Sequence, residues 1–172
     1  MTAARPGAAA LLEALERCGA AMALPGQPEP LYRALEDGLG ALYGHKIFSI
    51  MLLDEPAGEA ARVWSSRPEA YPVGGRKPLD PLTDWGRHVL GGRRSWLGRS
   101  MADIRWAFPD HETIAALGCG CCVNLIVIWD GRILGTINML HEEGRYAPPM
   151  LDEAAPFARL AVPGLLRSSE RR

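Results

Sequence analysis

The chain has 172 residues, of which 48% are hydrophobic, and this is enough for one domain with a substantial core. Its 19 basic and 20 acidic residues give a formal net charge of −1, so composition provides no electrostatic reason to expect a nucleic-acid or membrane partner. No stretch is long and apolar enough to span a bilayer, and Glu13, Glu16 and Arg17 interrupt the early apolar run, so we expect a cytoplasmic protein with reduced cysteines.

Two helices are predicted before the first strand. Residues 8–23 are rich in Ala, Leu and Glu, and their apolar side chains recur at helical spacing until the segment LPGQPEP at 24–30 breaks the pattern. A second stripe of leucines predicts a helix at about 30–43, and Gly44 is placed to end it.

Two strands and a long connection follow. The apolar segment KIFSIMLLD at 46–54 predicts a strand buried on both faces, and AARVWSS at 60–66 predicts its antiparallel partner. Beyond them we expect a loop at 71–81, a short helix at 82–92, a brief extended piece at 95–100 and a mixture of loop and short helix at 101–118.

The clearest signal is a hairpin near the C-terminal end. The segments CVNLIVIW and RILGTINMLH flank Asp130-Gly131, and Asp-Gly between two apolar runs favours a two-residue turn. A last helix is predicted at about 149–167, where Pro156 and Pro163 indicate a kink or an early stop. Helices at both ends and antiparallel strands between them predict one α+β domain.

Two segments resemble a known family. The sequence DGRILGTINMLHEEGRYAPPMLDEAAPFARLA at 130–161 resembles the C-terminal half of a GAF domain, and FSIMLLDE at 48–55 resembles the first strand of that family. The resemblance covers residues 28–168. It therefore divides the chain into an N-terminal helix at 1–27, a GAF-like domain at 28–168 and a short tail at 169–172.

The resemblance implies a GAF- or PAS-like α+β fold. A central antiparallel sheet would carry the N- and C-terminal helices on one face and a lid of loops and short helices over the other, where family members hold a ligand. It also implies a sensory or regulatory domain that binds a small molecule, although neither the ligand nor a cofactor can be named from the sequence. We expect a homodimer in which the first helix joins a bundle across a two-fold axis; alternatively, that helix folds back on its own domain.

The two-residue turn predicts which hairpin residues share a face. Counted back from the turn, Leu125 pairs with Thr136 and Val123 with Asn138. One face then holds Cys121, Val123, Leu125, Val127, Leu134, Thr136, Asn138 and Leu140, and the other holds Cys122, Asn124, Ile126, Ile128, Ile133, Ile137 and Met139. We expect the first face to line the cavity and the second, mostly aliphatic face to pack against helices. Asn138 would contact the ligand or be satisfied by internal hydrogen bonds.

Aromatic and cationic residues gather in or beside the connection. The tryptophans form either a small core of the lid or a wall for a flat or cationic ligand. Arg87, His88, Arg93 and Arg94 form either a solvated face or an anion contact. The candidate ligand-binding residues are therefore Trp64, Trp85, His88, Trp96, Trp106, Cys121, Val123, Thr136 and Asn138.

Three of the four cysteines lie in the segment LGCGCCVN. In a strand, Cys119 and Cys121 point to one face and Cys122 to the other, which does not suit a tetrahedral metal site, so we expect no metal. We favour a packing role for them over a redox role. The alternatives to a binding domain are a cysteine-dependent reductase of the free methionine sulfoxide type, which is one GAF subgroup, and a structural dimer with a filled cavity.

Overall fold

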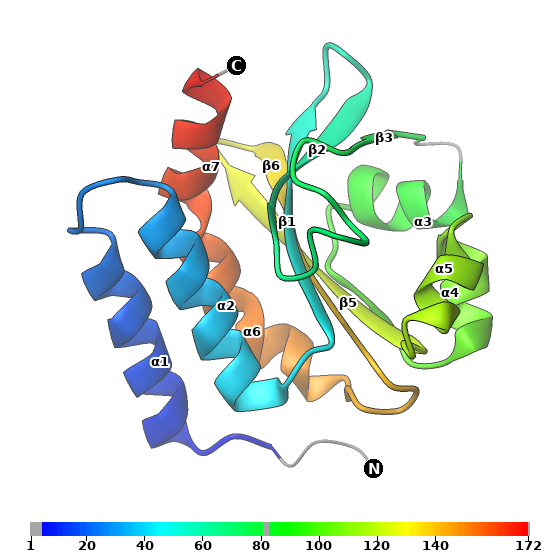
Figure 1. Ribbon diagram of the computed structural model, residues 1–172, viewed down its shortest axis with the longest axis horizontal. Helices are drawn as coiled ribbons and strands as arrows, with labels where there is room; N and C mark the ends of the chain where they lie inside the picture. Colours follow the sequence, from blue (N-terminus) through cyan, green and yellow to red (C-terminus); the bar gives the residue numbers. More distant parts are fainter. Residues whose placement is uncertain (1–4, 81–82, 172) are drawn as a thin grey trace.

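The computed structural model describes residues 5–80 and 83–171, which fold into three layers (Figure 1). A six-stranded sheet lies in the middle, four helices from the two ends of the chain cover one face, and a lid of short helices covers the other. This is the α+β arrangement that the sequence predicts. Pro81 and Leu82, where a loop is predicted to give way to a helix, lie outside the described residues, as do residues 1–4 and 172.

The sheet has the order β3-β2-β1-β6-β5-β4, and its neighbouring strands are antiparallel. The strands are β1 (Ile47–Asp54), β2 (Glu59–Ser65), β3 (Arg76–Pro78), β4 (Trp96–Gly98), β5 (Cys121–Trp129) and β6 (Arg132–His141). The two hairpins and the short extended piece that forms β4 agree with the prediction. The three-residue strand β3 lies in the segment that was predicted to be loop.

The helical layer contains α1 (Ala8–Ala21), α2 (Glu29–Tyr43), α6 (Pro149–Leu160) and α7 (Val162–Glu170). Gly44 ends α2 with a φ of 73°, a conformation that glycine adopts without strain. The predicted break in the last helix falls at Ala161, between α6 and α7, where Pro163 lies in the first turn of α7. Pro156 is accommodated inside α6.

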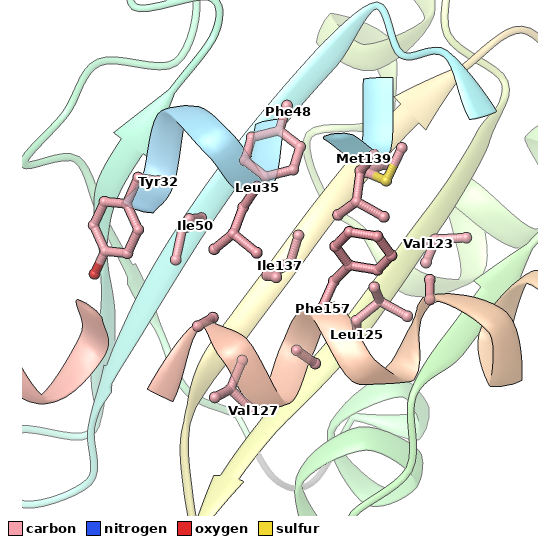
Figure 2. Packing of buried hydrophobic residues seen from close by; sticks show 14 of the residues in the cluster. Tyr32, Leu35, Phe48, Ile50, Val123, Leu125, Val127, Ile137, Met139 and Phe157 are labelled. Atoms are coloured by element: carbon pink, nitrogen blue, oxygen red, sulfur yellow. The ribbon is translucent and has the colours of Figure 1, made fainter. Parts of the chain in front are cut away.

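The main core lies between the sheet and these helices. Phe48 and Ile50 of β1, Ile137 of β6 and Phe157 of α6 are fully buried and point into the same space (Figure 2). The first helix belongs to this core, since α1 packs against α2 and α6 and buries Ala14. The fold-back arrangement named above as the alternative is therefore what the single chain adopts.

The lid consists of α3 (Asp84–Gly86), a single π-helical turn (Arg87–Gly91), α4 (Met101–Ala107) and α5 (His111–Ala116). Thr83 caps α3 by accepting a hydrogen bond from the Gly86 N–H at 2.9 Å. Ser100 and Asp103 form a capping box at the start of α4. These caps hold the short helices over the sheet, where they enclose a second, smaller apolar cluster that includes Val89, Trp96 and Ile104.

The turn of the β5–β6 hairpin is as predicted, but the predicted register is wrong beyond it. Asp130 and Gly131 both have positive φ, and Ile128 pairs with Ile133. Val127 then pairs with Gly135, so Leu134 is an extra residue on β6 and forms a β-bulge. Every pairing between the bulge and the base of the hairpin is thereby shifted by one residue.

The bulge changes which side of the sheet β5 presents to the lid. Cys121, Val123 and Leu125 were expected on the cavity face, but they belong to the main core. Figure 2 shows Val123 and Leu125 there with Ile137 and Met139. The even-numbered residues of β5, Cys122, Asn124 and Ile126, face the lid instead. Thr136 and Asn138 lie on the lid side as predicted, because β6 keeps its own alternation beyond the bulge.

None of the described helices has the length and hydrophobicity needed to cross a bilayer.

Candidate ligand-binding site beneath the lid

Buried polar residues are distributed unequally between the two faces of the sheet. Among the described residues the buried polar or charged side chains are Ser49, Arg62, Asn124, Thr136, Asn138 and Ser168. All of them except Ser168 belong to strands β1, β2, β5 and β6 and lie on the face beneath the lid. The opposite face packs against the helices almost entirely through apolar side chains. The interface between lid and sheet is therefore the polar interior of the molecule.

A row of hydrogen bonds crosses this interface. The Nε1–H of Trp85 in α3 donates to Oδ1 of Asn124 at 3.0 Å, and Nδ2 of Asn124 donates to Oδ1 of Asn138 at 2.7 Å. Nδ2 of Asn138 lies 3.4 Å from the Ser49 hydroxyl, at the long end of hydrogen-bonding distance. Asn138 thus has internal hydrogen-bond partners, which was one of the two alternatives that the sequence left open for it. The row also ties the lid to the middle of the sheet.

A charged cluster lies next to this row, at the β2–β3 edge. Arg62 of β2 places its guanidinium carbon 4.8 Å from the ring centroid of Tyr71, and its Nη1 donates to the Pro72 carbonyl at 3.3 Å. Lys77 of β3 donates to Oδ2 of Asp110 at 2.9 Å, and the Tyr71 hydroxyl donates to the same oxygen at 3.2 Å. The cluster joins β2, β3, the loop between them and the start of α5.

Burial shapes the charges of this cluster. Arg62 is only 7% exposed, and its burial lowers the pKa of the guanidinium, which nevertheless remains charged at neutral pH. Burial alone would raise the pKa of Asp110, but the Lys77 ammonium and the hydrogen bonds to the carboxylate outweigh it and lower that pKa. Asp110 is therefore ionised and can only accept hydrogen bonds.

Aromatic side chains connect the charged cluster with the amide row. The Phe108 ring centroid lies 6.1 Å from that of Trp85, 5.6 Å from that of Trp96 and 5.9 Å from the Lys77 ammonium. Trp106 stacks on Trp96 and is 47% exposed, so it lies at the outer surface of the lid and does not face the sheet. Trp85 thus borders the amide row, Phe108 borders the charged cluster, and the two rings lie against each other.

The other predicted site residues do not join this group. Trp64 lies on the helical side of the sheet, where its ring packs 6.0 Å from that of Tyr32 and its Nε1–H donates to Glu36. The cause is again a register shift, because the pairing of β1 and β2 slips between Ile50 and Met51. His88 is partly buried in the π-helical turn of the lid.

Cys121 and Val123 are buried in the main core, on the opposite side of β5 from the amide row. The four cysteines are free and buried. Burial raises the pKa of Cys119 to about 11 and also raises the pKa values of Cys121 and Cys122. A reactive cysteine needs the opposite shift, because the thiolate is the nucleophile. Within residues 5–80 and 83–171, no group of three or more His, Cys, Asp or Glu residues is arranged to hold a metal ion.

Sequence reasoning missed several residues of the site, namely Ser49, Arg62, Tyr71, Lys77, Phe108, Asp110 and Asn124. Asn124 could have been placed correctly from Gly135, because an isolated glycine inside a strand pattern is a bulge signal. The other residues come from four separate segments, and nothing in their spacing indicates that they meet.

Two surface hollows lie away from the lid. One, of about 60 Å³, is bordered by Tyr43, Arg145 and Glu153 near the start of α6. The other is an open groove of about 330 Å³ between α7 and the hairpin ends, bordered by Leu53, Leu134 and other residues. Neither touches the amide row or the charged cluster.

No family model matches the chain, and no curated protein matches it in sequence. Solved structures do match. The GAF domain of a phosphoenolpyruvate-protein phosphotransferase from Coxiella burnetii superposes with a TM-score of 0.74 at 15% identity, over 96% of this chain and 98% of that one.

Two further matches have other activities in their names. The chromophore-binding domain of an unusual bacteriophytochrome from R. palustris gives a TM-score of 0.67 at 12% identity, over 95% of this chain and 62% of that one. Free methionine-R-sulfoxide reductase from Neisseria meningitidis, in complex with its substrate, gives 0.69 at 14% identity, over 100% of this chain and 98% of that one. At such identities the agreement concerns the fold, and it extends over nearly the whole chain. The chain therefore has the GAF-domain fold.

Proposed function

We propose that this chain is a regulatory domain that binds a small molecule between its sheet and its lid. The observation that carries the proposal is the concentration of buried polar side chains on the lid face of the sheet. Burying polar groups is unfavourable unless they are hydrogen-bonded, so an interior built only for stability would be expected to use apolar residues there, as the helical face does.

The layout of the interface also suits a ligand site. Binding sites are mostly apolar and aromatic, with a few well-placed polar groups that fix the orientation of the ligand. Here Trp85 and Phe108 supply the aromatic surface, and Asn124, Thr136 and Arg62 supply the polar groups. The names of two structural neighbours refer to a bound chromophore and a bound substrate, which makes a small-molecule ligand a reasonable expectation for this fold. A cytoplasmic location belongs to the same proposal.

A fluorescence-monitored ligand screen tests this proposal. Trp85 belongs to the lid and reaches the sheet through Asn124, and Trp129 is 52% exposed on the tip of the distant β5–β6 hairpin, so the two residues form a matched pair of reporters. The full chain is screened against nucleotides, amino acids, organic acids, sugars and tetrapyrroles by thermal shift, and each compound that raises the melting temperature is titrated against tryptophan emission.

A ligand beneath the lid should change the emission of the wild type and of Trp129→Phe to the same extent, and that of Trp85→Phe less, because Trp96 is then the remaining tryptophan beside Phe108. If the signal follows Trp129 instead, the ligand binds elsewhere and the location is wrong. If no compound in any class raises the melting temperature, the binding function itself loses its support.

We also propose that the chain forms a homodimer. Leu12 on the outer face of α1 is 59% exposed, and Leu160 and Leu166 on α6 and α7 are only partly buried, so apolar surface remains on the helical layer. Light scattering of the full chain at tens of micromolar should give twice the monomer mass. A monomeric result would contradict the proposal. A variant with Leu12→Glu separates a role of α1 from a role of α7, because only the former would be disrupted.

A further inference from the structure

Two buried side-chain atoms lack a hydrogen-bond partner among the described residues, and both belong to the charged cluster. They are Nε of Arg62, a donor, and Oδ1 of Asp110, an acceptor. Buried polar groups are hydrogen-bonded in the great majority of cases, and each exception needs an explanation. A free donor and a free acceptor in one cluster indicate that the missing partner carries one group of each kind.

Tyr71 gives the scale of the separation between the two charged groups, because it contacts the Arg62 guanidinium and the other carboxylate oxygen of Asp110, Oδ2. Its ring lies against the Arg62 guanidinium, with 4.8 Å between the guanidinium carbon and the ring centroid, and its hydroxyl contacts Asp110 at 3.2 Å. The two charged groups are therefore about one tyrosine side chain apart. The rest of the ligand would extend toward Phe108, which also borders the Lys77 ammonium, and so toward Trp85.

We propose that the lid site recognises a small carboxylic acid with a hydrogen-bond donor, a hydroxyl or an ammonium group, on the carbon next to the carboxylate. The carboxylate would accept from Arg62 Nε, and the neighbouring donor would point at Asp110 Oδ1. This inference rests on the proposed binding function and specifies the class of ligand.

The charges of the cluster favour the anionic end of such a molecule. Arg62 and Lys77 contribute two positive charges and Asp110 one negative charge, so the cluster carries a net charge of +1 before a ligand binds. Hydrogen bonds with an ionised partner are roughly twice as strong as neutral ones, and a carboxylate suits the geometry of a guanidinium. Lys77 and Tyr71 both donate to Oδ2 of Asp110, so Oδ1 is the oxygen left to accept from the ligand.

The test is a matched series of compounds on the full chain. For methyl, isobutyl and benzyl side chains in turn, the set contains the α-amino acid, the α-hydroxy acid, the plain carboxylic acid and the corresponding amine. Binding is measured by thermal shift and by the Trp85 emission. We expect the amino acid or hydroxy acid of at least one side chain to bind about tenfold more tightly than both the plain acid and the amine.

Two substitutions then assign the contacts. Arg62→Met removes the donors and keeps the apolar stem, so it should weaken every carboxylate in the series, the plain acid included. In Asp110→Asn the amide oxygen replaces the one that accepts from Lys77 and Tyr71, which places an N–H group where Oδ1 stood. This variant should lose the preference for the α-donor without weakening the plain acid, because it also removes the negative charge of the cluster. Arg76→Gln, on an exposed residue of the same sheet edge, is the control and should change neither quantity.

Each remaining outcome overturns the inference. If no compound of the series binds, the two atoms are joined by an ordered water only. The same conclusion follows if the amino and hydroxy acids show no advantage, or if Asp110→Asn, the milder change, leaves the preference intact. A compound of another class that binds with a Trp85 signal would refute this inference and still support the proposed binding function. The absence of any Trp85-linked ligand would refute both.

Discussion

The amide pair beneath the lid allows a quantitative test of how this interface is held together. Asn124→Leu keeps the branched shape and the number of heavy atoms of the side chain, but Oδ1 of Asn138 loses its 2.7 Å donor and Nε1 of Trp85 loses its acceptor. A buried polar group left without a partner costs about 1–3 kcal/mol, and Trp85 is only partly buried. We therefore expect the free energy of unfolding to fall by about 2–3 kcal/mol, and the melting temperature to fall by roughly 4–12 °C for a domain of this size.

The informative quantity is the coupling between the two asparagines. Asn138→Leu leaves Nδ2 of Asn124 with a single contact, the Cys122 sulfur at 3.5 Å, and should by itself cost about 1–3 kcal/mol. The double variant leaves neither amide orphaned, so it should be less destabilised than the sum of the single variants by about 1–2 kcal/mol. Urea unfolding of the wild type and the three variants gives this coupling free energy. Additivity within about 0.5 kcal/mol would show that the pair contributes no mutual stabilisation, and would refute the reasoning.

Three further predictions concern the strands, the thiols and the acid response. An added Cβ at Gly135 would lie 2.1 Å from a backbone oxygen of β1, so Gly135→Ala should reduce the unfolding free energy by about 3 kcal/mol. Gly19→Ala, in an open helical position, should raise it by about 0.5–1 kcal/mol, and urea titrations that give the two variants the same unfolding free energy would contradict this. Burial raises the pKa of Cys119 to about 11, so native protein should react with a disulfide reagent at pH 7.5 far more slowly than urea-unfolded protein, and a fast native thiol would refute the packing role. Burial would raise the pKa of Asp110, but Lys77 and the hydrogen bonds to the carboxylate lower it, so the stability that Asp110 contributes is present above the ordinary aspartate pKa of about 4 and is lost as pH falls through the pKa of the folded state. The difference in unfolding free energy between the wild type and Asp110→Asn should shrink over that range, and a difference that stays constant from pH 7 to pH 3 would refute the assignment.

The elements of the fold were accessible to sequence reasoning because each carries a local signal. The Asp130-Gly131 turn needs positive φ at both residues, and these residue types tolerate it, so the hairpin followed from two positions. Gly44 and Pro163 likewise marked the end of α2 and the break between α6 and α7. Because helices with apolar stripes must cover a sheet, the layering followed from the elements.

The site was harder to predict from the sequence than the fold, because its geometry depends on single residues and not on a periodic pattern. A single extra residue on β6 exchanged the faces of β5, and this placed Asn124 beneath the lid and Val123 in the main core. Arg62 and Asp110 meet only because the loop between β2 and β3 folds back over the edge of the sheet, where Tyr71 contacts both. Their sequence separation contains no period from which such a contact could be inferred.

Because of the bulge at Leu134, the number of residues in β6 decides which side chains lie beneath the lid. Between the turn and the bulge, residues 128–133 can change in sequence without affecting which side chains lie beneath the lid. Insertion or deletion of one residue between the bulge and the base of the strand would move Asn138 into the apolar core and bring Met139 beneath the lid. Divergent chains that keep this polar face should therefore accumulate substitutions at the hairpin tip while conserving the number of residues behind it, so that an alignment gap in β6 marks the loss of the site.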